Sequence, residues 1–122
     1  MNHVSHALLE TADSGGLYAY NNASHTSVYR YNLVENLIGN ISARPAGTEK
    51  IVHAIYMDNY VHDVLIHDNT VREIDGSGIC INAGAHDIEV RKNHVYKVHS
   101  GLIMPYWLAG ASIYGNIVKR NK

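Results

Sequence analysis

Short segments of alternating apolar and polar residues recur along the chain and predict β-strands with one buried face. One kind of segment precedes an asparagine, with aliphatic residues five and three positions before it, as Val64 and Ile66 stand before Asn69. A second short segment follows the asparagine, with aliphatic residues two and five positions after it. A third predicted strand occurs four times, over 16–20, 54–58, 78–82 and 101–105.

These segments form an internal repeat. The aligned asparagines are residues 2, 32, 69, 93 and 116, spaced by 30, 37, 24 and 23 residues. Each repeat is too short to bury its own apolar face, so successive repeats must stack and share one core. Since no amphipathic helix of useful length is visible, the pattern predicts an all-β parallel β-helix of about four to five coils. It predicts one domain over 1–122, a slice of a longer solenoid, with an insertion over 39–49.

Each aligned asparagine is predicted to turn the chain sharply. Asparagine tolerates the left-handed backbone region better than most residues, so we expect a positive φ at these positions. Stacked repeats would place the asparagines one above another. Their amides would then form a ladder of hydrogen bonds through the turn.

Composition narrows the function classes. Apolar residues make up 46% and charged residues 17%, which argues against disorder. The net charge of −1 gives no reason to expect nucleic acid, and no apolar run approaches the ~20 residues of a membrane helix. Cys80 is the only cysteine, and the nine histidines show no metal-binding spacing, so we expect no cofactor and no metal. The first residues show no signal peptide, and the compartment stays unassigned.

The segments ADSGGLYAYN, VYRYNLVEN, AIYMDN and SGICINAGAHDIEVRKNHV resemble the right-handed parallel β-helix, pectate-lyase-like superfamily, in its glycosidase-like bacterial branch. The resemblance implies a right-handed β-helix with ligands on the outer face of one parallel sheet. That sheet would be the one built from the third strand of each repeat. It also implies a carbohydrate ligand, while the superfamily's varied reactions leave the chemistry open.

The outer positions of the third strand are rich in tyrosine, asparagine and aspartate. Flat aromatic rings cover the apolar faces of sugars, and amides and carboxylates bond their hydroxyls. The predicted sugar-binding residues are Tyr18, Tyr20, Tyr56, Asn59, Asn82, Tyr106 and Trp107.

Asp58 is the leading catalytic candidate, because the resemblance aligns it with the acidic nucleophile of β-helical glycosidases. Glycoside hydrolysis normally needs two carboxyl groups, and the equivalent position one repeat later is Asn82. A second candidate acid–base cluster lies at the other end of the strand, comprising Asp13, His53, Asp75 and His99. A polysaccharide lyase is less favoured, because the candidate sheet carries no lysine or arginine. Two functions therefore stay open, a glycosidase-like enzyme and a non-catalytic structural or glycan-binding module.

The ends of such a solenoid expose strand edges. No polar capping segment is visible, and exposed edges recruit partners. We therefore expect a homo-oligomer formed through the solenoid ends, with the N-terminal end preferred. Lys119, Arg120 and Lys122 would repel one another at a contact between two C-terminal ends.

Overall fold

The computed structural model describes all residues except 12, 22–25, 41–50, 104–109, 111 and 120–122. The described residues form β-strands and turns, with no helix among them. In particular, none of the described segments is a helix long and apolar enough to cross a membrane. The strands are β1 (His3–Ser5), β2 (Asp13–Ala19), β3 (Ser27–Arg30), β4 (Leu33–Leu37), β5 (Ile51–Met57), β6 (His62–His67), β7 (Thr70–Ile81), β8 (His86–Arg91), β9 (His94–Ile103), β10 (Ser112–Tyr114) and β11 (Ile117–Lys119).

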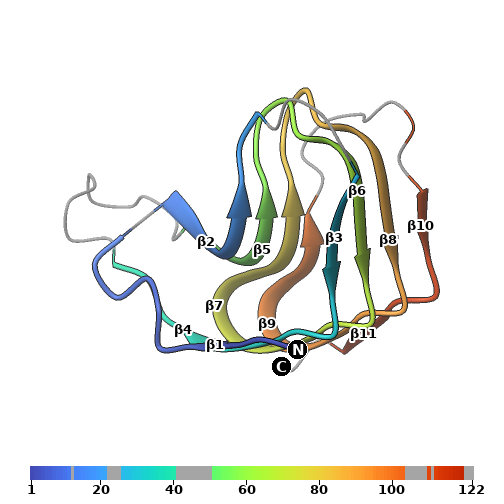
Figure 1. Cartoon of the computed structure of the whole chain (residues 1–122). Coiled ribbons are helices and arrows are strands. Elements are labelled where there is room, and N and C mark those ends of the chain that lie inside the picture. The colour runs from blue at the N-terminus through green and yellow to red at the C-terminus, as the bar shows by residue number, and fades with distance from the viewer. Residues whose placement is uncertain (12, 22–25, 41–50, 104–109, 111, 120–122) are drawn as a thin grey trace.

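The strands form two sheets, and every pairing between them is parallel. The larger sheet has the order β1-β4-β7-β5-β2, with β9 paired to β7 and β11 to β9, and the smaller has the order β10-β8-β6-β3. Figure 1 shows β2, β5, β7 and β9 side by side, with β3, β6, β8 and β10 forming a second row. This all-β, parallel arrangement was predicted from the sequence, and it is compatible with a β-helix-like fold.

The register of the sheets follows the sequence repeat. Thr70 pairs with His94, and Val64 pairs with Ile88, so equivalent residues of successive repeats are neighbours. The second and third predicted strands prove to be continuous in β7 and β9, which bend where the register shifts between Ile74 and Ser77. Gly76 lies in this bend, where a Cβ atom would collide with the carbonyl group of Val52.

The core lies between the two sheets. Inward positions are filled mainly by valine and isoleucine, whose branched side chains pack well on a pleated surface. Val34, Val71 and Val95 are in register, and each is at most 1% exposed. Ile55 and Ile79 form an equivalent pair on the third strand. Apolar stacking between repeats therefore fixes which face of each strand points outward.

The asparagine ladder is present and continuous from Asn2 to Asn116. Asn69 donates its backbone N–H and its side-chain Nδ2–H to Oδ1 of Asn93, at 3.0 and 2.9 Å. Asn32 makes the same two bonds to Asn69, Asn2 to Asn32, and Asn93 to Asn116. Nδ2 of Asn69 also donates to a backbone carbonyl, that of Tyr29, and the amides of Asn93 and Asn116 make equivalent bonds. The ladder thus satisfies buried polar groups at the turns that lead from the smaller sheet back to the larger one.

The prediction of a positive φ at the ladder asparagines is wrong. The left-handed residue is the one before each of the last four ladder asparagines, namely Tyr31, Asp68, Lys92 and Gly115, with φ between 52° and 63°. The asparagine itself must point both its N–H and its side chain toward the next repeat, so the preceding residue makes the sharp turn. The sequence pattern predicted the turn correctly, but the residue with the positive φ lies one position before the asparagine.

The corrected geometry gives a stability prediction. Asn69→Ala and Asn69→Gly should both lower the free energy of unfolding by about 1–3 kcal/mol, because either change leaves the buried partners of the amide unmatched. Glycine should not rescue the loss, since Asn69 does not carry the positive φ.

Asp68→Gly is the matched control and should cost clearly less, because glycine tolerates the left-handed conformation of residue 68. Urea denaturation of the three variants checks this. A large loss in Asp68→Gly together with a small loss in Asn69→Ala would contradict the assignment.

Candidate functional site

The candidate site lies on the outer face of the larger sheet, where β2, β5 and β7 end. Tyr18, Tyr56 and Cys80 are in register on neighbouring strands, as the alignment of the repeats predicted. The residues just after these strands continue the alignment. The N–H of Asp58 donates to the Ala19 carbonyl, and the N–H of Asn82 donates to the Met57 carbonyl.

Asp58 is the centre of a hydrogen-bond cluster drawn from three repeats. Its Oδ2 accepts a bond from the Tyr18 hydroxyl at 2.7 Å. Its Oδ1 accepts bonds from the Asn82 amide and from the N–H of Asn59, each at 2.8 Å. The Asn82 amide also donates to the Tyr56 hydroxyl oxygen at 3.1 Å. Residues separated by up to 40 positions in the sequence therefore converge on one carboxylate.

The cluster keeps Asp58 ionised. Burial raises the pKa of Asp58, but the hydrogen bonds from Asn82, Tyr18 and Asn59 outweigh burial and lower the pKa below the ordinary value. Burial and the bond to Asp58 raise the pKa of Tyr18 to about 12, and burial with the nearby Asp58 charge raises the pKa of Tyr56 as well. At neutral pH the two phenols are therefore donors. Asp58 can act as a base, a nucleophile or an acceptor for hydroxyl groups, but not as a general acid.

The tyrosine rings at the site differ in their exposure to solvent. Tyr18 and Tyr20 are 48% and 55% exposed, whereas Tyr56 is 4% exposed. The Tyr56 ring meets Tyr18 edge to face, with centroids 5.4 Å apart. Tyr60 adds a further exposed ring just beyond Asn59, packed over Gly84, where a Cβ would lie 2.7 Å from the ring. Tyr60 was not among the predicted sugar-binding residues, although its place two residues after Asp58 could have indicated it.

His53 lies beside this cluster in a buried position. Its Nδ1 is hydrogen bonded to the Ser77 hydroxyl, and its ring meets the Tyr56 ring with centroids 4.4 Å apart. Burial lowers the pKa of His53 to about 4, against the opposing effect of Asp13 and Asp58. His53 is therefore neutral at pH 7. Ser77 was not singled out in the sequence; the register of the repeats, which pairs it with His53, is the signal that could have found it.

Cys80 is a buried thiol of the same face. Its exposed fraction is 4%, and burial raises its pKa to about 12. A nucleophilic cysteine needs a lowered pKa, so Cys80 serves packing between Tyr56 and the next repeat.

The four residues of the predicted second acid–base cluster lie on β2, β5, β7 and β9. Asp13 pairs in register with Ile51 rather than His53, yet its negative charge acts on Tyr18, Tyr56 and His53. Asp75 is exposed in the bend of β7. The hydrogen bonds that lower the pKa of Asp58 come from Asn82, Tyr18, Asn59 and Tyr56.

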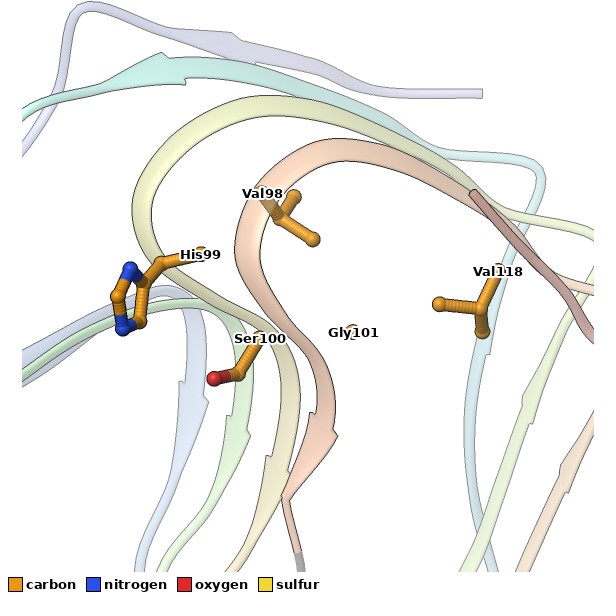
Figure 2. Close-up of a pocket in the computed structure, with 5 residues that line it drawn as sticks. All are labelled: Val98, His99, Ser100, Gly101 and Val118. Carbon is orange, nitrogen blue, oxygen red and sulfur yellow. The ribbon is translucent and has the colours of Figure 1, made fainter. Parts of the chain in front are cut away.

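His99 borders a different hollow, of about 270 Å³, which it shares with Val98, Ser100, Gly101 and Val118. Figure 2 shows Val98 and Val118 pointing toward each other across Gly101, while the His99 ring points to the other side of the bend. Polar His99 and Ser100 line this hollow together with two valines, and none of the residues that bond Asp58 lines it. The predicted residues Tyr106 and Trp107 lie outside the described residues.

Within the described part of the chain, no group of three or more His, Cys, Asp or Glu side chains could hold a metal ion. Comparison with known protein families, with curated proteins and with solved structures finds no match. The geometry around Asp58 is therefore the best guide to function.

The buried His53 gives a pH prediction. Its folded pKa lies below its unfolded value, so between pH 6.5 and about 4 the unfolded state binds more protons than the folded state. The free energy of unfolding should therefore fall as the pH drops through this window, and His53→Asn should reduce that fall.

Urea titrations at pH 7 and pH 5 measure this effect. His99→Asn is the matched control, because His99 is exposed, and it should keep the pH dependence of the parent protein. An unchanged pH dependence in His53→Asn would show that His53 is not buried in its neutral form.

Proposed function

We propose that the chain is a right-handed parallel β-helix that binds carbohydrate on the outer face of β2, β5 and β7. The supporting observation is the Asp58 carboxylate, fixed by Tyr18 and Asn82 from neighbouring repeats and bordered by exposed tyrosine rings. The resemblance to the pectate-lyase-like superfamily points to the same face and the same ligand class.

The chemistry of the site suits a neutral sugar. Tyr18 and Tyr20 offer flat apolar surfaces that can cover a pyranose ring, while Asp58 and Asn82 offer an acceptor and an amide for its hydroxyls. Hydrogen bonds to an ionised carboxylate are stronger than neutral ones, so Asp58 would be the main polar anchor. The negative charges of Asp58 and Asp13 act on this face and disfavour an anionic sugar.

Hydrolysis is the second candidate function. Asp58 is ionised, as a nucleophile or base must be, and Asp13 is a second carboxyl group whose charge reaches Tyr18 and Tyr56. Asn82 occupies the position where a second carboxyl group was expected, and it donates a hydrogen bond to Asp58 instead. This favours binding over hydrolysis.

A glycan array followed by calorimetry tests binding. Tyr20→Ala should weaken binding of the selected oligosaccharide by about tenfold, since an exposed aromatic ring contributes on the order of 1 kcal/mol or more to such stacking. Tyr114→Ala is the matched control, because Tyr114 is 50% exposed but lies on β10, and it should leave the affinity unchanged. Failure of every glycan to bind the parent protein would overturn the proposal.

The same oligosaccharide tests hydrolysis. If the site is catalytic, Asp58→Asn should abolish the release of reducing ends, while the affinity measured by calorimetry changes far less. A bound oligosaccharide that stays intact on the parent protein would assign a binding role without catalysis.

Assembly through the ends of the solenoid stays a prediction. Ile117 and Val118 in β11 are 54% and 49% exposed, although Val118 is in register with the buried Val95. These apolar positions are the described surface on which a further strand could pack.

A further inference from the structure

A second hollow lies on the outer face of the larger sheet, beside the asparagine ladder rather than beside Asp58. Its volume is about 410 Å³, within the range of about 300–1,000 Å³ that is typical of small-molecule sites. We call it the Thr70 groove; it is lined by Met1, Tyr31, Asn32, Leu33, Asp68, Thr70 and Arg72.

The Thr70 groove is lined mainly by residues of two neighbouring repeats, with Met1 added from the first repeat. Leu33 in β4 pairs in register with Thr70 in β7, and both side chains are partly exposed beside the buried Val34 and Val71. Tyr31 is 54% exposed, and its ring meets the buried His67 edge to face, with centroids 5.7 Å apart. The flat Tyr31 ring therefore lies beside a surface formed by the apolar Leu33 side chain and the Thr70 hydroxyl.

The charged groups of the groove are already paired. Arg72 contacts Glu35 at 2.5 Å between Nη2 and Oε2, and this contact lowers the pKa of Glu35. Asp68 contacts Nδ1 of His67 at 2.6 Å, and that hydrogen bond lowers the pKa of Asp68. An anionic ligand would meet two ionised carboxylates here and an arginine that is already engaged. The groove therefore favours a ligand without net charge.

The other polar atoms of the groove suit the hydroxyl groups of a ligand. In the described part of the chain, the hydroxyls of Thr70 and Tyr31 have no hydrogen-bond partner, and Oδ1 of Asp68 accepts no bond from another side chain. A polyhydroxyl ligand has donors for Asp68 and both donors and acceptors for the two hydroxyls. Its apolar face could lie on Tyr31 and Leu33.

We propose that the Thr70 groove is a second carbohydrate site, specific for neutral sugars and independent of the Asp58 face. Asp58, Tyr18 and Tyr20 do not line the groove. The two sites lie on different parts of the same sheet, so a chain-like saccharide could be held at more than one place on the molecule.

Two-dimensional NMR of the isotope-labelled protein tests the proposal. The probes are cellohexaose, xylohexaose and maltohexaose, with hexagalacturonate as an acidic control of the same length. At least one neutral hexasaccharide should shift the amide signals of Leu33 and Thr70, and hexagalacturonate should bind at least about tenfold more weakly.

Three variants separate recognition from folding. Thr70→Val keeps the shape of the side chain but removes the hydroxyl, and it should weaken binding by about fivefold, whereas Thr70→Ser should retain it. Tyr31→Asn removes the ring but suits the positive φ of residue 31, and it should weaken binding by a similar factor. Thermal unfolding of each variant checks that the fold is retained.

The outcomes distinguish this proposal from the one made for Asp58. Shifts confined to Tyr18, Tyr56 and Asp58 would overturn the Thr70 groove and support the first site. Shifts confined to Leu33 and Thr70 would support the groove and overturn the first site. Equal binding by Thr70→Val, equal affinity for hexagalacturonate, or no shift with any neutral hexasaccharide would overturn the groove.

Discussion

Hydrogen bonding between the asparagines of successive repeats is the constraint on which the rest of the structure depends. Parallel strands in two sheets must be joined by turns whose backbone groups are partly buried, and a buried unpaired amide costs on the order of 1–3 kcal/mol. Each asparagine resolves this by donating twice to the next one, with Asn69 and Asn93 almost fully buried. The ladder therefore fixes the register of the sheets on both sides of the turn.

That register in turn creates the Asp58 site. Tyr18, Asp58 and Asn82 belong to three different repeats, and only the alignment of those repeats brings a phenol and an amide to one carboxylate. A shift of one residue in any strand would exchange its inward and outward faces and dismantle the cluster. The register of the strands therefore determines both the packing of the core and the geometry of the Asp58 cluster.

Much of this arrangement was predictable, because aligning the repeats shows which residues of neighbouring strands lie side by side. Aligning the asparagines placed Tyr18, Tyr56 and Cys80 in one outward row and valines such as Val71 and Val95 in the core. The alignment could not show the bend that joins two predicted strands into β7, since a bend at Gly76 depends on the close approach of Val52 from another repeat.

Other features depend on contacts that no local pattern reveals. The positive φ falls on Asp68 rather than Asn69, because the ladder dictates where the Asn69 amide must point. The pairing of His53 with Ser77 was missed because serine in a glycine-rich stretch is typical of a turn. Asp75 and His99 were grouped with Asp13 and His53 by position along the repeat, and that grouping stays a prediction.

Amide hydrogen exchange of the ladder tests the central claim most directly. The backbone N–H of Asn69 bonds to a side chain, Oδ1 of Asn93, so its protection depends on that side chain. In the parent protein this amide should exchange as slowly as the core amides of Val71 and Val95. In Asn93→Ala it should lose protection far more than those core amides do. An Asn69 amide that exchanges rapidly in the parent protein, or that keeps its protection in Asn93→Ala, would contradict the account.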